Sequence, residues 1–254
     1  MATRPRNGDE RQNRASARRA REHEIVEATR ALFDERGVQD APIEEIARAV
    51  GINKALIYRH FGSQEELFVL TVTSYLAELE SSFGEVDESL DPISQLREVS
   101  ERYGAFCRTY PAFLDCALSL MRRPYQDLAE SVSAGVLFRL GQAMSGCLSR
   151  LSGILAEGAE QGVFRAHDPD YIANYLYAQG LGAMHLARVG AGVRVLAPGV
   201  PQMFPIDPQE VVRTAVEGTF AYILAPQSNG NSKKASAAKA SGTKSRSTKS
   251  GTTS

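Results

Sequence analysis

The sequence contains only three cysteines among its 254 residues, and they form no recognisable pattern for a metal or a disulfide. Cys107, Cys116 and Cys147 lie among apolar residues, and no two of them have Cys-x-x-Cys spacing. This argues against both a disulfide framework and a cysteine zinc site. We interpret them as buried small hydrophobic side chains, with a thiol sensor as the open alternative.

Long apolar runs are also absent. No stretch approaches the roughly 18 consecutive apolar residues of a membrane span. The arginines near the N-terminus are not followed by the apolar segment of a secretory signal. We therefore expect a cytoplasmic protein with no membrane partner, and a chain of this length can bury the core of one or two domains.

The motifs of several enzyme classes are missing as well. The chain has no Gly-x-Ser-x-Gly turn, no P-loop and no His-Glu-x-x-His motif. The glycine pairs at Gly180–His185 and Gly190–Val195 lack the third glycine of a dinucleotide fingerprint, and they follow predicted helices instead of strands. The sequence favours a protein that is not an enzyme and has no cofactor or metal.

The formal net charge of −1 hides a strong partition of charge along the chain. Residues 1–21 hold seven arginines and two acidic residues, and residues 226–254 hold six basic residues and no acidic one. The body, residues 22–225, holds 16 basic and 28 acidic residues, a net of −12. Both ends have too little apolar surface to order themselves, so we expect a disordered basic arm and a disordered basic tail. Such segments can add sequence-independent phosphate contacts, although a solubilising role of the tail remains open.

The most informative stretch runs from Ala41 to Phe61 and predicts two short helices joined by a glycine turn. Pro42 suits the first turn of a helix, where its missing N–H costs nothing. Gly51 suits the left-handed conformation that ends that helix. The apolar residues of the first helix recur on one face: Ile43, Ile46, Ala47 and Val50.

The second helix is predicted at about Asn53 to Phe61, with Ile57 and Phe61 facing inward one turn apart. The residues around them then point outward, near the positive end of the helix dipole. Such a face suits a major groove that is lined by phosphates. We expect seven residues to contact DNA: Asn53, Lys54, Ala55, Leu56, Tyr58, Arg59 and His60.

With its flanks, this segment resembles the DNA-binding domain of the TetR family of bacterial repressors. Residues 25–37 resemble the first helix of that domain, and residues 44–67 resemble its second and third helices and the start of the fourth. Within residues 44–67, Tyr-Arg-His-Phe followed by Gly-Ser-Gln-Glu-Glu-Leu is the most specific element. The resemblance implies phosphate contacts for Tyr58 and His60.

Two positions depart from the family pattern. Ala41-Pro42 stands where the family commonly has a hydroxyl residue that caps the second helix and reaches a phosphate. Ala55-Leu56 replaces a frequent Gly-Thr and offers an apolar surface that suits a thymine methyl group. The operator sequence therefore cannot be taken from relatives.

Beyond residue 70 the sequence predicts further helices and no convincing strands. Ser63 and Glu66 form a capping-box pattern, and Asp-Pro pairs mark three later helix starts. The glycine-rich and proline-rich segment from Gly190 to Pro205 is predicted as a long loop. The predicted helices span about 63–83, 92–110, 113–121, 125–164 with a break near 133–135, 168–189 and 207–224.

These elements predict an all-α protein in two parts. Residues 22–67 are expected to form a three-helix helix-turn-helix domain. Residues 68–225 are expected to form a helical ligand-binding and dimerisation domain.

Aromatic and soft apolar side chains on the later helices are candidates for the wall of a cavity. Most of them are equally consistent with ordinary core packing, and His185 on an apolar helix is more typical of a core histidine than of a ligand. Arg122, Arg123 and Arg139 are candidate polar anchors, and Met144 and Tyr177 add apolar surface. The candidate pocket residues are Tyr103, Phe106, Phe113, Met121, Tyr125, Phe138, Tyr175, Met184 and His185.

The family resemblance implies that a small apolar or amphipathic effector binds between these helices, and that the last two long helices form a homodimer interface. Small residues on the first of these helices, and an apolar face on the second, agree with close helix packing. We therefore expect a homodimeric repressor that an effector releases from its operator. The alternative is an effector-independent protein that coats DNA without sequence preference. The apolar face comprises Val211, Val212, Ala215, Val216, Thr219 and Tyr222.

Overall fold

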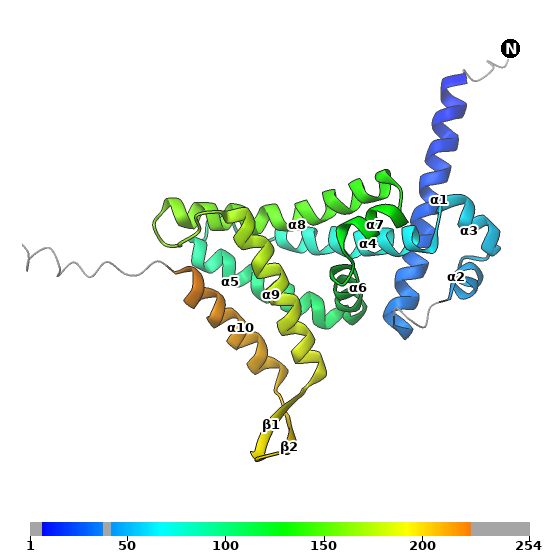
Figure 1. The fold of residues 1–254 in the computed structure, drawn as a ribbon. Helices are drawn as coiled ribbons and strands as arrows, with labels where there is room; N and C mark the ends of the chain where they lie inside the picture. The colour runs from blue at the N-terminus through cyan, green and yellow to red at the C-terminus, as the bar shows by residue number, and fades with distance from the viewer. Residues whose placement is uncertain (1–6, 38–41, 225–254) are drawn as a thin grey trace, which may run out of the picture.

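The computed structural model describes residues 7–37 and 42–224, and within them it contains ten helices and one β-hairpin (Figure 1). The expected all-α class is confirmed, with the hairpin as an addition. The helices are α1 (Asn7–Arg36), α2 (Ile43–Val50), α3 (Lys54–His60), α4 (Gln64–Gly84), α5 (Pro92–Thr109), α6 (Pro111–Met121), α7 (Tyr125–Ser131), α8 (Ala134–Glu160), α9 (Pro169–Val189) and α10 (Pro208–Ile223), and the strands are β1 (Ala191–Ala197) and β2 (Val200–Pro205).

The three N-terminal helices pack around a small apolar core at one end of the molecule (Figure 1). Ile25 and Phe33 of α1 are buried with Ile46 of α2 and with Ile57 and Phe61 around α3. The inward positions predicted for Ile57 and Phe61 are confirmed, since each is only 1% exposed. This core fixes the angle between α2 and α3, which is what a helix-turn-helix needs.

The predicted disorder of residues 1–21 is wrong for Asn7 to Arg21, which form the first half of α1. Adding a residue to an existing helix costs little, because each new residue gains a hydrogen bond. The segment is also rich in alanine and arginine, which favour helices. Ion pairs of Arg18 with Glu22 (3.0 Å) and of Arg21 with Glu24 (2.7 Å) add support. Residues 1–6, Ala41 and the tail at 226–254 lie outside the described residues.

The body is built around two long helices, α4 and α8, which lie side by side (Figure 1). α5 and α9 pack on α8, and α10 packs on α9 and α5. α4 is continuous through residue 67, so it begins beside the three N-terminal helices and ends inside the body. One rigid element therefore reaches from the end of α3 to the centre of the body.

Local capping signals set several of the helix starts. The side chains of Ser63, Asp91, Asp168 and Asp207 each accept a hydrogen bond from a backbone N–H in the first turn of the following helix. The break predicted near Ser133 is also confirmed, since α7 and α8 are separate helices. In these places the local sequence alone decides where a helix begins.

The segment from Gly190 to Pro205, predicted as a loop, instead forms the antiparallel hairpin β1–β2. Ala191 pairs with Pro205 at its base, and Ala197 pairs with Val200 at its tip. A two-stranded ribbon has only edges, so its prolines block no inner ladder bond. The local proline and glycine content predicted a loop because it does not show that the two halves of the segment pair with each other.

The hairpin and one short bridge hold the two ends of α10. At the N-terminal end, the N–H of Ile206 donates to the carbonyl of Gly190 at 2.9 Å. At the C-terminal end, Leu224 forms a β-bridge with Phe164, and the N–H of Arg165 donates to the carbonyl of Ile223 at 2.6 Å. α10 is thus anchored at both ends.

All three cysteines are buried and free, as predicted. Burial raises the pKa of Cys107 and of Cys147 to about 12, and it raises that of Cys116 further. Thiols in this state are poor nucleophiles, which disfavours the thiol-sensor alternative. Among the described helices, none is both long enough and apolar enough to traverse a bilayer.

Candidate functional site

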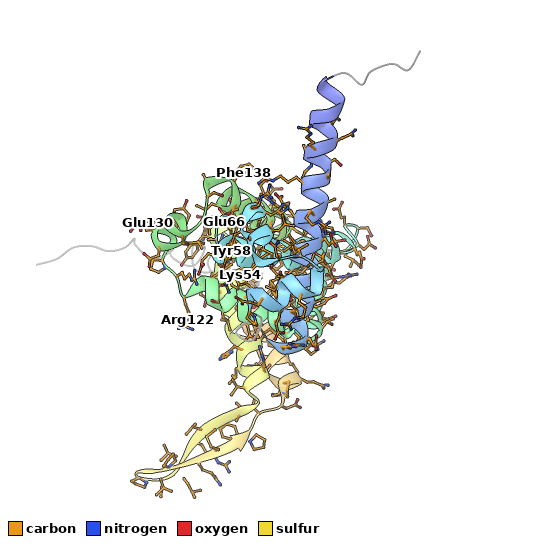
Figure 2. All side chains as sticks on the ribbon, turned by 90° about the vertical axis from the view of Figure 1, so that its right-hand side faces the viewer. Lys54, Tyr58, Glu66, Arg122, Glu130 and Phe138 are labelled. Atoms are coloured by element: carbon orange, nitrogen blue, oxygen red, sulfur yellow. The ribbon has the colours of Figure 1, made fainter. Side chains whose placement is uncertain are left out.

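The exposed face of α3 carries the residues predicted to contact DNA. Asn53, Lys54, Ala55 and Arg59 are exposed, and Tyr58 is 41% exposed. Leu56 and His60 are partly buried. Lys54 and Tyr58 lie on the end of the molecule that faces the viewer in Figure 2. The structure therefore brings all seven residues together on one short helix and its cap.

The turn before α3 is fixed by glycine and asparagine. Gly51 has φ of 70°, the left-handed conformation expected at the end of α2. The Asn53 side chain accepts a hydrogen bond from the N–H of Leu56 at 2.8 Å, which caps α3. Asn53 therefore has a structural role that the prediction of a DNA contact did not include.

Lys54 is already paired within the protein. Its ammonium group contacts the Glu44 carboxylate at 2.5 Å, and this hydrogen bond raises the pKa of Lys54 and lowers that of Glu44. Both groups are exposed, so the pair exchanges readily with solvent or with a phosphate. An acidic residue beside α3 therefore already holds this lysine in the protein without DNA.

His60 differs from the other candidates. Its ring packs near that of Phe61, with centroids 6.4 Å apart. Its Nδ1 is shielded from solvent and has no hydrogen-bond partner within the described part of the chain. Only its other ring nitrogen is therefore open to a phosphate.

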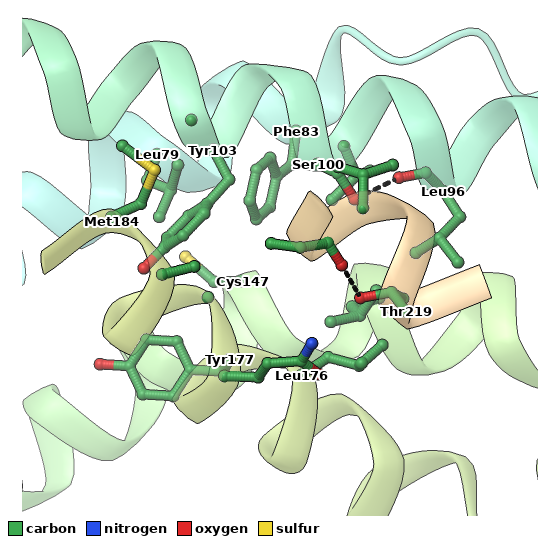
Figure 3. A pocket seen from close by; sticks show the side chains of 18 of the residues that line it. Leu79, Phe83, Leu96, Ser100, Tyr103, Cys147, Leu176, Tyr177, Met184 and Thr219 are labelled. Carbon is green, nitrogen blue, oxygen red and sulfur yellow. Dashed lines mark hydrogen bonds between the residues drawn. The ribbon is translucent and has the colours of Figure 1, made fainter. Parts of the chain in front are cut away.

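A second candidate site is a cavity inside the body, enclosed by α4, α5, α8, α9 and α10 (Figure 3). About 970 Å³ lies between the lining side chains, and this volume includes the mouth that opens to solvent. The side chains that line it are almost all apolar, and none of them is charged. The lining comprises Leu76, Leu79, Phe83, Leu96, Val99, Ser100, Tyr103, Gly104, Met144, Cys147, Leu148, Leu151, Leu176, Tyr177, Gln179, Gly180, Ala183, Met184, Val212, Ala215, Val216 and Thr219.

The two sites are connected through α4. Leu76, Leu79 and Phe83 on this helix line the cavity. At the other end of α4, the Glu66 carboxylate accepts hydrogen bonds from the backbone N–H of Gly62, just beyond α3, at 2.7 Å and from that of Ser133, at the start of α8, at 2.8 Å. These bonds lower the pKa of Glu66.

A polar cluster forms a further connection between α1 and the body. The Arg30 guanidinium lies 4.3 Å from the ring centre of Tyr75 and 4.7 Å from that of Tyr110, and it donates a hydrogen bond to Glu78. Tyr110 donates to Glu78 at 2.6 Å, and Tyr75 donates to Asp34 at 2.7 Å. Burial opposes the charge on Glu78, but the bonds from Tyr110 and Arg30 outweigh it and lower its pKa.

Comparison with known proteins agrees with this arrangement. Residues 25–70 match the family model described as bacterial regulatory proteins, tetR family. The HTH-type transcriptional repressor KstR2 of Mycobacterium tuberculosis is 26% identical over 160 residues, which is 62% of this chain and 74% of KstR2. Residues 25–70 thus carry the N-terminal domain of a TetR-family regulator. The curated relatives that the chain matches are transcriptional regulators and not enzymes.

Solved structures of TetR regulators share the fold. The structure of KstR2, described as a ketosteroid transcriptional regulator of Mycobacterium tuberculosis, has a TM-score of 0.53 at 20% identity, over 81% of this chain and 96% of that one. AibR, solved in complex with isovaleryl coenzyme A and operator DNA, has a TM-score of 0.54 at 17% identity, over 79% of this chain and 98% of that one. At such low identity these similarities support the fold alone.

Of the nine pocket candidates, the structure places only Tyr103 and Met184 in the cavity wall. Phe106 and Phe113 are buried against each other, with ring centroids 5.2 Å apart, in an aromatic core with Tyr75 and Tyr110. The other five are exposed and do not line it, because their helix faces point to solvent: Met121, Tyr125, Phe138, Tyr175 and His185.

Among the remaining expectations, Met144 and Tyr177 do line the cavity, whereas Arg122, Arg123 and Arg139 do not. Sequence reasoning missed the leucine and valine residues that α4, α5 and α8 contribute. Nothing in their helical spacing separates them from ordinary core residues, since a cavity depends on how well several helices meet.

The apolar face of α10 borders the cavity. Val212, Ala215, Val216 and Thr219 line it and are each partly buried. The outer side of α9 and α10 exposes other apolar side chains. These are Tyr171 (63%), Tyr175 (45%), Leu186 (42%), Val189 (54%) and Tyr222 (51%).

Proposed function

We propose that this protein is a homodimeric TetR-family repressor of the cytoplasm that a small apolar or amphipathic effector releases from its operator. The observation that carries the proposal is that α4 forms a wall of an apolar cavity and also begins directly after the recognition helix. An effector that fits only one position of α4 therefore shifts the position of α3.

The DNA-binding step uses α3 of each protomer in successive major grooves of a roughly palindromic operator. Arg59 and the apolar pair Ala55–Leu56 are proposed to contact base edges, while Lys54, Tyr58 and His60 contact phosphates. The exposed Arg14, Arg18 and Arg19 of α1 add positive charge to the same N-terminal domain. The AibR complex with operator DNA and an acyl coenzyme A supports this plan by analogy.

The dimer is proposed to form through the outer side of α9 and α10. Tyr175 and Tyr222 lie on adjacent helices with ring centroids 5.4 Å apart, and both are about half exposed. Exposed aromatic pairs of this kind are typical of interface centres. Exposed Gly182 on the same helix face lets a second helix approach closely.

A binding-site selection from random-sequence DNA tests the proposal. The selected operator should bind at least about 10³-fold more tightly than random DNA at physiological salt, because base contacts add to the phosphate contacts. A protein that only coats DNA would bind both equally. That result would favour the alternative, for which the basic first half of α1 is the supporting observation.

A further inference from the structure

One polar group in the cavity has an unmet hydrogen-bonding capacity. The Tyr103 hydroxyl is shielded from solvent, and within the described chain it makes no hydrogen bond of good geometry; its polar neighbour is the Cys107 thiol, which is only a weak partner. Of the three other hydroxyl groups in the lining, on Ser100, Tyr177 and Thr219, two have already used their single protons. Ser100 donates to the carbonyl of Leu96 at 2.8 Å, and Thr219 donates to that of Ala215 at 3.0 Å.

The Tyr103 ring is held in place by its neighbours. It extends from α5 among the side chains that line the cavity (Figure 3). Gly180 on α9 makes room for it, because a Cβ there would lie 3.0 Å from Cε1 of the ring. Burial, together with the nearby Cys107, raises the pKa of Tyr103 well above its ordinary value. The hydroxyl is therefore a protonated donor at neutral pH.

The rest of the lining restricts the charge of a ligand. None of the residues that line the cavity is Asp, Glu, Lys, Arg or His. A carboxylate or phosphate placed there would lose its water without gaining a cation, which is strongly unfavourable. A pure hydrocarbon would leave the Tyr103 donor without a strong partner. The lining thus disfavours both charged ligands and pure hydrocarbons.

We propose that the cavity binds an uncharged, mostly apolar molecule with one oxygen acceptor, such as a ketone, and that this oxygen accepts a hydrogen bond from Tyr103. The inference rests on the proposed function in taking this cavity as the effector site. It goes further because it specifies the chemical class of the ligand and the residue that forms a hydrogen bond with it.

The experiment measures ligand binding in the full chain without DNA. The fluorescent probe is prodan, an uncharged naphthalene ketone whose emission shifts to the blue in an apolar site. Decan-2-one and decanoate, which have the same number of carbons, then compete with it at pH 8. We expect prodan to bind saturably, and decan-2-one to displace it at a concentration at least about tenfold lower than decanoate, because only decanoate carries a charge into the cavity.

Two tyrosine variants locate the hydrogen bond. Tyr103→Phe should weaken displacement by decan-2-one about tenfold, the equivalent of one hydrogen bond. Tyr177→Phe removes a hydroxyl from a second tyrosine of the same cavity and should change it less than about twofold. The proposal would be overturned if decan-2-one and decanoate displaced prodan at equal concentrations. It would also be overturned if Tyr103→Phe left displacement by decan-2-one unchanged.

Operator release by the same two ligands distinguishes a failure of this inference from a failure of the proposed function. If decan-2-one binds through Tyr103 but the selected operator stays bound, the ligand class is supported and release by an effector is contradicted. If the operator is released by decanoate but not by decan-2-one, the ligand class is wrong and regulation by an effector stands.

Discussion

The Glu66 carboxylate accepts a hydrogen bond from the backbone N–H of Ser133 at 2.8 Å, across 67 positions of sequence. Its second oxygen accepts one from Gly62, directly after the recognition helix. A single side chain therefore joins the start of α8 to the end of the helix-turn-helix. Because α8 also lines the cavity, this contact is a candidate for coupling between the two sites.

Replacing Glu66 with alanine should uncouple the sites. We expect Glu66→Ala to keep operator affinity within a few-fold but to reduce effector-driven release by about tenfold, a typical coupling energy. It should also cost about 1 to 3 kcal/mol of stability, because two backbone donors lose a charged acceptor. Operator titrations by fluorescence anisotropy, with and without ligand, measure the coupling. Gln64→Ala is the matched control on α4, and normal release in the Glu66→Ala variant would contradict this coupling.

Acid should weaken the same contacts. The pKa values of Glu66 and Glu78 are both below their ordinary value of 4.5 in the folded protein. Their contribution to stability is therefore complete above about pH 5 and is lost as the pH falls through the lowered values. Urea midpoints between pH 7 and pH 3 should fall less steeply for the Glu66→Gln, Glu78→Gln double variant than for the native chain. Parallel curves would show that neither group is linked to folding.

Arg59 and Lys54 should contact different parts of the DNA, the base edges and the phosphates respectively. Arg59→Ala should cost about 1 to 3 kcal/mol on the operator and relax base preference. Lys54→Ala should weaken operator and random DNA alike and lower the salt slope by about one. Affinities on both DNAs at several salt concentrations distinguish the roles. If Arg59→Ala lowers the affinity for operator and for random DNA by the same factor, Arg59 contacts phosphate.

The exposed arginines on the first half of α1 should supply salt-dependent affinity. Deleting residues 1–21 should flatten the dependence of log affinity on log salt by several units without changing the preferred operator. A variant with Arg14, Arg18 and Arg19 replaced by alanine keeps helix propensity and tests charge alone. An unchanged slope in both variants would exclude a role of this helix in DNA binding.

A charge on the outer face of α9 should separate the protomers. Tyr175→Glu places a carboxylate opposite its symmetry mate in a surface that becomes dry on dimerisation, so we expect a helical monomer. Operator affinity should fall steeply, because each half-site must then be bound independently. Sedimentation velocity and circular dichroism measure both properties. Tyr125→Glu is the control, since Tyr125 is 74% exposed on α7, and a dimeric Tyr175→Glu would exclude this face.

Local sequence signals were sufficient to predict most of the helices. Gly51, Ser63 and the three Asp-Pro pairs act through hydrogen bonds within one turn, so the sequence around them is sufficient to place the helix ends. The spacing of Ile57 and Phe61 likewise determines which side of α3 faces outward. The recognition surface was predictable for this reason.

The cavity was not predictable in the same way. Tyr103 and Phe106 are neighbours on α5 and are chemically similar, yet one lines the cavity and the other packs in an aromatic core. The difference arises from small residues on other helices, such as Gly180, that leave room for one ring. The hairpin escaped prediction for a related reason, since Gly192 and Phe204 form a contact only once the strands pair.

The anchoring of α10 has a consequence for timing. This helix contributes four of the residues that line the cavity, yet both of its ends are tied, by the hairpin on one side and by the Phe164–Leu224 bridge on the other. Because α10 cannot move aside as a unit, the existing mouth of the cavity is the route by which a ligand enters and leaves. We therefore expect the rate of ligand exchange to depend on the side chains at that mouth and not on a large opening of the domain.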